Sequence, residues 1–270
     1  MSSSAFGRLN DVFSGPGAAQ RFRHRLLYLY LLLIFVLVLA PVAMILPIAF
    51  VADFQILFRE QYINGITNSF ILGFTVAILA TVLSTAAARY YRQVKNKNAY
   101  ILFMSLPLFI PADTHAVAVA ATARELGIGL GFWTLVGAHL TYVFPYAFLM
   151  VLATMAGLPK SLLAAAQDLG ATGFRAFRDV ELPLVADGVI SAFLVSFLLS
   201  FNEAPRALIL GGAGFETLSS LVLAYYDSIG ITIALYGINV VMTLFAIVVV
   251  VGILTLVLLK SRQRAAAAAN

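Results

Sequence analysis

Long apolar runs separated by short polar connections make up almost the whole chain. Six of these runs reach or exceed the roughly 20 residues that an α-helix needs to cross the hydrocarbon core of a bilayer. They cover residues 26–50, 66–88, 99–121, 133–156, 184–210 and 231–259. The pattern therefore predicts an all-α, polytopic membrane protein with six transmembrane helices. Its transmembrane domain would occupy residues 26–260, between a flexible N-terminal arm at 1–25 and a tail at 261–270.

The composition supports the bilayer as the solvent for this chain. Hydrophobic residues make up 62% of it, charged residues make up 11%, and the mean hydropathy is +0.98, whereas soluble domains carry about 25% charged residues. The first apolar run is longer than the core of a typical signal peptide, so we expect it to be retained as a helix. The absence of cysteine excludes disulfides, thiolate metal sites and cysteine nucleophiles.

The lysines and arginines alternate between connections in a way that predicts orientation. Most of the 17 lie in the N-terminal arm, the second and fourth connections and the tail: Arg8, Arg21, Arg23, Arg25, Arg89, Arg92, Lys95, Lys97, Lys160, Arg175, Arg178, Lys260, Arg262 and Arg264. The others, Arg59, Arg124 and Arg206, belong to the remaining three connections. Because positive residues gather on the cytoplasmic side, we expect both termini in the cytoplasm. The net charge of +5 then reflects topology, and no nucleic-acid partner is expected.

The fourth connection, residues 158–183, is long, cytoplasmic in this topology and only half polar. Pro159 suits the start of a helix, the alanines that follow favour helix strongly, and Gly170 suits its C-terminal end because glycine accepts left-handed backbone angles. A second short helix can run over 172–178. We therefore expect two short helices joined at a glycine. This elbow is either an interaction site with exposed apolar surface or an amphipathic connector on the membrane.

The spacing of the elbow resembles the signature loop of binding-protein-dependent ABC importer permeases of the MetI-like type. That signature is Glu-Ala-Ala, three residues, Gly, nine residues and Ile-x-Leu-Pro. Here Ala165-Ala166 and Gly170 are followed nine residues later by Val180-Glu181-Leu182-Pro183. Ala164 replaces the family's Glu, which puts one polar contact with the ATPase in doubt. The resemblance implies an ATPase-coupling loop comprising Ala164, Ala165, Ala166, Asp168, Gly170, Ala171, Thr172, Phe174 and Pro183.

The same resemblance implies the other components of an importer in the bacterial inner membrane. They are a second homologous permease subunit, a dimer of ABC ATPase subunits and a periplasmic solute-binding protein. ATP and Mg would be bound by the ATPase, because this chain has no Gly-x-x-x-x-Gly-Lys-Ser/Thr motif. We expect no cofactor, metal site or catalytic residue in this chain, which would be a translocation subunit and not an enzyme.

Two shorter segments resemble the spermidine/putrescine branch of these permeases. One covers residues 126–133 with His139 after it, and the other is Leu199-Ser200-Phe201-Asn202-Glu203. That branch has two neighbouring acids where this chain has Asn202 and Glu203. The expected substrate is a small organic cation, and the loss of one acid leaves opines, phosphonates and amino acid derivatives open.

Ionisable side chains inside spans cost about 2.5–3.5 kcal/mol and usually face a cavity or a partner. His115 and His139 are expected to pack between helices, since no third metal ligand accompanies them. Glu203 either attracts an amine by charge-assisted hydrogen bonding or pairs with Arg206 one turn away. The predicted substrate path comprises Ser200, Asn202, Glu203, Asp113, Trp133 and Tyr142. The two aromatic residues could equally anchor the helices at the membrane interface.

Two other classes of function remain open on these residues. An ion-coupled secondary transporter would use Asp113 and Glu203 as coupling acids. A membrane-embedded enzyme would use His115 and Asp113. Neither accounts for the spaced alanine, glycine and proline residues of the elbow.

Overall fold

The computed structural model describes residues 18–49, 54–212, 214–230 and 232–269, and every regular element within these ranges is helical. The chain divides into two compact units, Met1–Ala52 and Asp53–Asn270. The described part of the first unit is a single helix, α2 (Ala18–Ala49), whose apolar side chains at residues 26–37 are exposed. Residues 1–17 of the expected arm lie outside the described residues. The all-α prediction is confirmed for the described chain.

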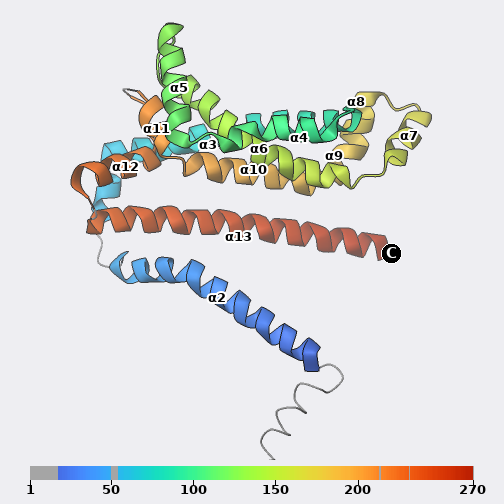
Figure 1. Ribbon diagram of the computed structural model, residues 1–270, viewed down its shortest axis with the longest axis horizontal. Helices are drawn as coiled ribbons and strands as arrows, with labels where there is room; N and C mark the ends of the chain where they lie inside the picture. The colour runs from blue at the N-terminus through green and yellow to red at the C-terminus, as the bar shows by residue number, and fades with distance from the viewer. Residues whose placement is uncertain (1–17, 50–53, 213, 231, 270) are drawn as a thin grey trace, which may run out of the picture. The chain divides into compact units, whose positions relative to one another are not determined.

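Three helices form the centre of the second unit: α3 (Glu60–Tyr90), α6 (Phe132–Ala156) and α10 (Ala186–Phe201) (Figure 1). Buried positions recur along α3 at intervals of three and four residues, as at Leu72, Val76 and Ala80, which places them on one face. Many of them are small residues, and small residues allow helices in a membrane to approach closely. The core therefore depends on close helix contact as well as on apolar side chains.

Two prolines break the third predicted span. The helix α4 (Lys97–Ser105) runs into η3 (Leu106–Phe109), and α5 (Ala112–Glu125) then departs at 90°. Pro107 lies in the first turn of η3, and Pro111 precedes the first residue of α5. Because proline lacks an N–H and clashes with the preceding turn, it favours helix starts, although Pro145 lies inside α6. The two prolines therefore account for the interruption of this span.

The fifth predicted span, residues 184–210, is also interrupted. The helix α10 ends at Phe201, and α11 (Pro205–Leu210) follows with Pro205 as its first residue. After it come α12 (Leu218–Ile229) and α13 (Ile233–Ala269), which includes most of the predicted tail. A short 3-10 helix, η1 (Phe54–Phe58), precedes α3.

Among the described residues, two helices are long and apolar enough to cross a membrane, Glu60–Gln93 and Phe132–Ala156. The number rises to four if each of two sharply bent helix pairs counts as one span, and two shorter apolar helices lie at His24–Leu37 and Leu235–Val249. The six-span count therefore stays a prediction.

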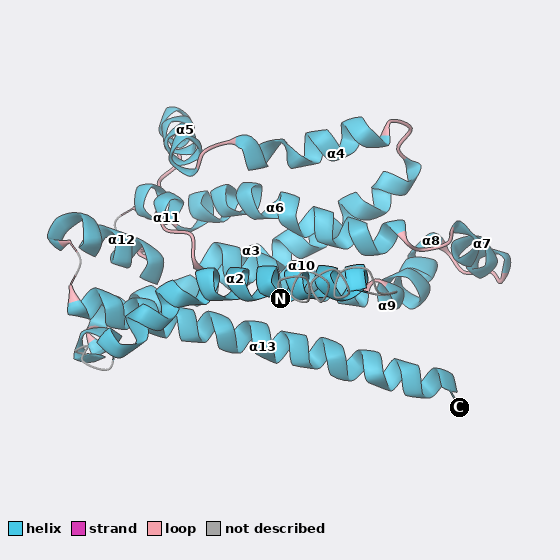
Figure 2. Ribbon diagram, turned by 60° about the horizontal axis from the view of Figure 1, so that its bottom comes forward, coloured by secondary structure: helices cyan, strands magenta, loops and turns pink. Residues whose placement is uncertain are grey.

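The polar features of the second unit gather at opposite ends of its central helices. The fourth connection, with α7 (Lys160–Asp168) and α8 (Gly173–Ala176), lies at one end, whereas α5, α11 and α12 lie at the other (Figures 1 and 2). Each end contains one of the two groups of residues predicted to be functional.

Candidate functional site

The elbow has the two-part form expected from its sequence. Pro159 precedes α7, which ends at Asp168, and Gly170 follows in the left-handed region with φ of +84°. The amide of Gly170 donates to Gln167 O at 2.8 Å, and the amide of Ala171 donates to Ala166 O at 3.0 Å. These bonds satisfy carbonyls at the end of the helix, so Gly170 ends α7 as predicted.

The second half of the elbow differs from the single short helix expected at 172–178, because its α-helical part is shorter and continues into a wider, π-helical turn. Thr172 caps α8, its side chain accepting from the amide of Arg175 at 3.3 Å. The chain then forms a π-helix, η4 (Phe177–Glu181), and a single turn, α9 (Leu182–Leu184), which contains Pro183. A bend of 75° separates this segment from α10.

The outer surface of the elbow is apolar and exposed. Leu169 is 90% exposed and Phe174 is 67% exposed, while Ala164 and Ala165 leave the neighbouring surface flat. Exposed apolar residues of this kind are typical of an interaction site, and they also suit the amphipathic connector that the sequence left open. The small alanines allow a second protein to come close to the backbone.

The elbow also carries an exposed ion pair. Arg178 donates to Asp179 through Nε at 2.6 Å and through Nη2 at 3.1 Å. These hydrogen bonds hold the pKa of Asp179 below its ordinary value and raise the pKa of Arg178. Because both side chains face solvent, the pair contributes little to the fold.

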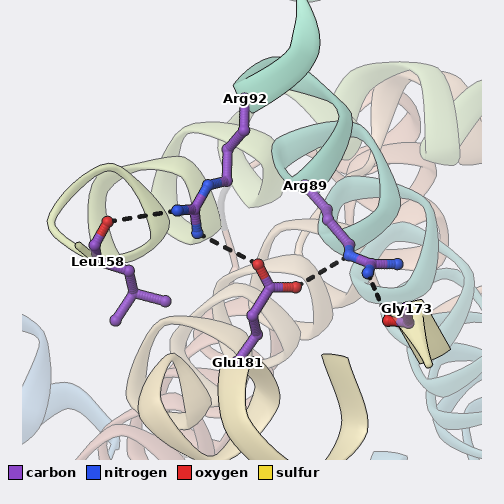
Figure 3. A network of polar contacts seen from close by, with 5 residues as sticks. All are labelled: Arg89, Arg92, Leu158, Gly173 and Glu181. Carbon is purple, nitrogen blue, oxygen red and sulfur yellow. Dashed lines mark hydrogen bonds and ion pairs between the residues drawn. The ribbon is translucent and has the colours of Figure 1, made fainter. Parts of the chain in front are cut away.

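A second, buried ion cluster at the base of the elbow was not predicted. Glu181 contacts Arg89 and Arg92, which come from the end of α3 and from η2 (Tyr91–Gln93) (Figure 3). The sequence pattern gave these arginines a role only in topology and treated Glu181 as a spacer. Their pairing joins segments about 90 residues apart in the chain and has no local sequence pattern.

At the other end, Glu203 lies at the break between α10 and α11 in a buried polar cluster. Its Oε1 accepts from Arg206 Nη1 at 2.7 Å, and both side chains are buried. Arg206 Nε also donates to His115 Nδ1 at 3.3 Å, and its guanidinium lies 4.4 Å from the ring centroid of Tyr142. Of the two interpretations of Glu203, the structure therefore shows the pairing with Arg206.

Ser200 lies one turn before this cluster. Its Oγ is 2.9 Å from Nδ1 of His139, and both residues are buried. The other ring nitrogen of His139, Nε2, is buried and has no hydrogen-bond partner among the described residues. The expected packing role of His139 is compatible with this position in the core.

Asn202 is placed differently from its neighbour Glu203. It is exposed and lines a cavity of about 500 Å³ with side chains from α12 and α13, including Tyr226 and Asn239. The other lining residues are Ala204, Ser219, Val222, Leu223, Leu235, Met242, Thr243 and Ala246. None of the described lining side chains is charged.

The remaining predicted path residues lie elsewhere. Asp113 is exposed in the first turn of α5. Trp133 is 74% exposed and lines a separate apolar groove between α5 and α6. Glu203 and Tyr142 both contact Arg206, whereas Asn202 and Trp133 line two other cavities and Asp113 is exposed on α5. No cluster of three or more potential metal ligands occurs within the described ranges.

The chain is similar to one protein family, to several proteins of known function and to solved structures. Residues 97–264 match the family described as "Binding-protein-dependent transport system inner membrane component". The spermidine/putrescine transport system permease protein PotC of Haemophilus influenzae is 28% identical over 72% of this chain and 76% of its own length. PotC of Escherichia coli K12 is 27% identical over 59% of this chain and 61% of its own length. An inward-facing MetNI methionine ABC transporter superposes with a TM-score of 0.59 at 16% identity, covering 72% of this chain and 94% of that chain.

Proposed function

Because the chain belongs to the family of binding-protein-dependent inner membrane transport components, we propose that it imports polyamines. The members of this family are translocation subunits and not enzymes. It is a permease subunit of an ABC importer. With a second homologous permease it forms the path for putrescine, spermidine or a similar organic cation. A periplasmic binding protein delivers the solute, and a dimer of ATPase subunits binds ATP and Mg.

The observation that carries this proposal is the shape and surface of the elbow. A rigid helical turn ends in an exposed Leu169, is fixed by Gly170 and continues into an exposed Phe174. Its flat alanine face fits a cleft on another protein. In the proposed importer the energy for transport enters through this contact, from a separate ATPase subunit. The coupling-loop residues from Ala164 to Phe174 are therefore the proposed ATPase contact.

The proposed topology has six spans with both termini in the cytoplasm of a bacterium. A direct contact between the second and fourth connections supports this topology, because the charge pattern assigns both of them to the cytoplasmic side. Arg89 and Arg92, at the start of the second connection, contact the fourth connection directly. Two connections on opposite faces of a bilayer could not make such contacts, because the hydrocarbon core is about 30 Å thick.

For the substrate path we propose the cavity lined by Asn202. The side-chain amides of Asn202 and Asn239 offer carbonyl oxygens to a passing amine, and the ring of Tyr226 offers a π face. A weakly binding, uncharged path suits a permease that receives its solute from a selective binding protein. The same lack of charge favours, as a second candidate, import of a different small solute such as an opine, a phosphonate or an amino acid derivative.

Transport by the assembled importer tests the proposed function. The chain would be co-expressed with its partner permease, ATPase and binding protein and reconstituted in proteoliposomes. We expect uptake of radiolabelled putrescine or spermidine that requires ATP and the binding protein. Uptake that is driven by a proton or sodium gradient without the ATPase would instead support a secondary transporter.

A double variant separates the two roles of Glu203. Glu203→Gln alone leaves Arg206 buried and unpaired, and breaking such a pair costs about 3–5 kcal/mol of stability. Glu203→Gln with Arg206→Gln removes both charges together, so we expect a folded importer. If Glu203 attracts the amine, putrescine uptake by the double variant falls while uptake of a neutral solute through the same importer is unchanged. If the double variant takes up putrescine as fast as the wild type does, Glu203 is not part of the path.

A further inference from the structure

The buried cluster at the base of the elbow, here called the clasp, consists of Arg89, Arg92 and Glu181. Glu181 Oε2 accepts from Arg89 Nε at 2.9 Å, and Glu181 Oε1 accepts from Arg92 Nη1 at 3.2 Å (Figure 3). The glutamate side chain is 3% exposed. A carboxylate with so little contact with water needs charged partners on both oxygens, and the two guanidinium groups supply them.

Each arginine also holds a backbone carbonyl of the elbow. Arg89 Nη2 donates to Gly173 O at 2.8 Å, and Arg92 Nη2 reaches Leu158 O at 3.5 Å. Arg89 further stacks on the ring of Phe177, 4.8 Å from its centroid. The clasp therefore fixes the elbow at its beginning, at the start of α8 and at the end of η4. All three points are tied to two residues one turn apart in α3 and η2.

This arrangement adds a connection that the chain itself does not provide. Along the backbone, the elbow continues only into α6 on one side and into α9 and α10 on the other. The clasp attaches it to α3, the helix that packs against both α6 and α10. The elbow thus has a direct contact with α3 in addition to its two backbone connections.

Resting on the proposed function, we propose that the clasp is the positioning device that transmits movement of the elbow into α3. Arg89, Arg92 and Glu181 are positioning residues and touch neither ATP nor solute. Without the clasp, the ATPase contact on the outer face of the elbow remains, but the elbow moves independently of α3. Hydrolysis then continues while transport per ATP falls.

The test is the number of putrescine molecules imported per ATP hydrolysed by the full importer in proteoliposomes. The variants are Glu181→Gln, which keeps the side-chain volume, and Arg89→Gln, which removes the more exposed partner in case the first variant fails to fold. We expect the ratio to fall by roughly fivefold or more, a typical size for coupling between two sites. For Arg89→Gln, whose side chain is partly exposed, the yield of assembled complex with bound ATPase should stay near that of the wild type. Glu181→Asp, which keeps the charge, should recover part of the ratio.

Asp179→Asn supplies the matched control, because it removes an exposed ion pair from the same segment without touching the clasp. Its transport ratio should equal that of the wild type. A wild-type ratio in Arg89→Gln and in Glu181→Gln, or a lower complex yield with a normal ratio in the complexes that form, would overturn the clasp. Failure of the wild-type importer to move any polyamine with ATP would instead refute the proposed function, and the clasp inference with it.

Discussion

Replacing Gly170 with valine is expected to lower ATP-driven uptake by roughly 5- to 30-fold or more. Gly170 has φ of +84°, and a residue with a Cβ loses about 1–2 kcal/mol in this conformation, which corresponds to such a factor. A β-branched residue is strained further. The elbow can relieve the strain only by changing the angle between α7 and α8, which moves Leu169 and Phe174 out of their relative positions. Uptake and substrate-stimulated ATP hydrolysis measure the effect together.

Two further variants in the elbow test whether backbone strain at Gly170 causes the loss of uptake. Gly170→Asn should retain most of the activity, since asparagine tolerates left-handed angles better than other residues with a side chain. Gly173→Ala should be close to wild type, because Gly173 has no positive φ and a Cβ there would meet no atom within 4 Å. Normal stimulated turnover in Gly170→Val would show that the angle of the elbow does not matter for coupling.

Replacing Gly188 with alanine is expected to destabilise the helical core by about 1–3 kcal/mol, the usual cost of overpacking. A Cβ at Gly188 would lie 2.7 Å from Cγ2 and 2.9 Å from Cβ of Thr154, at the contact between α10 and α6. The two helices must move apart, and this affects the packing of both. For a chain of this size, the melting temperature in detergent should fall by about 2–4 °C for each kcal/mol lost.

A compensating change tests the same contact from the other side. Thr154→Gly removes the three atoms nearest to the new methyl group, so combining it with Gly188→Ala should restore part of the lost melting temperature. The control is Gly137→Ala, in the same helix as Thr154, where a Cβ has open space. If Gly188→Ala melts like the wild type, the helices at this contact are less closely packed than the structure indicates.

Local sequence rules were sufficient for the features that depend on a few neighbouring residues. Pro159 and Gly170 predicted the limits of α7, because the backbone preferences of proline and glycine act at their own positions. The prolines at 107 and 111 likewise explain the interruption before α5. The apolar runs predicted α6 to within one residue, whereas α3 begins six residues before its predicted run.

The clasp and the placement of Asn202 could not be predicted in the same way. Arg89 and Glu181 are 92 residues apart, and their pairing depends on how α3 packs beside the elbow. The cavity at Asn202 depends on α12 and α13 folding back towards the end of α10, which no local pattern specifies. By contrast, Glu203 and Arg206 are three residues apart, so the sequence could offer their pairing as one interpretation, beside the attraction of an amine by Glu203.

The π-helical turn at Phe177–Glu181 has a consequence for how the loop tolerates insertions and deletions. Each residue of an α-helix advances the side-chain direction by about 100°. Removing one residue from the helical stretch 173–181 would therefore turn the glutamate carboxylate away from both guanidinium groups. The number of residues in this stretch thus sets the direction in which the Glu181 side chain points.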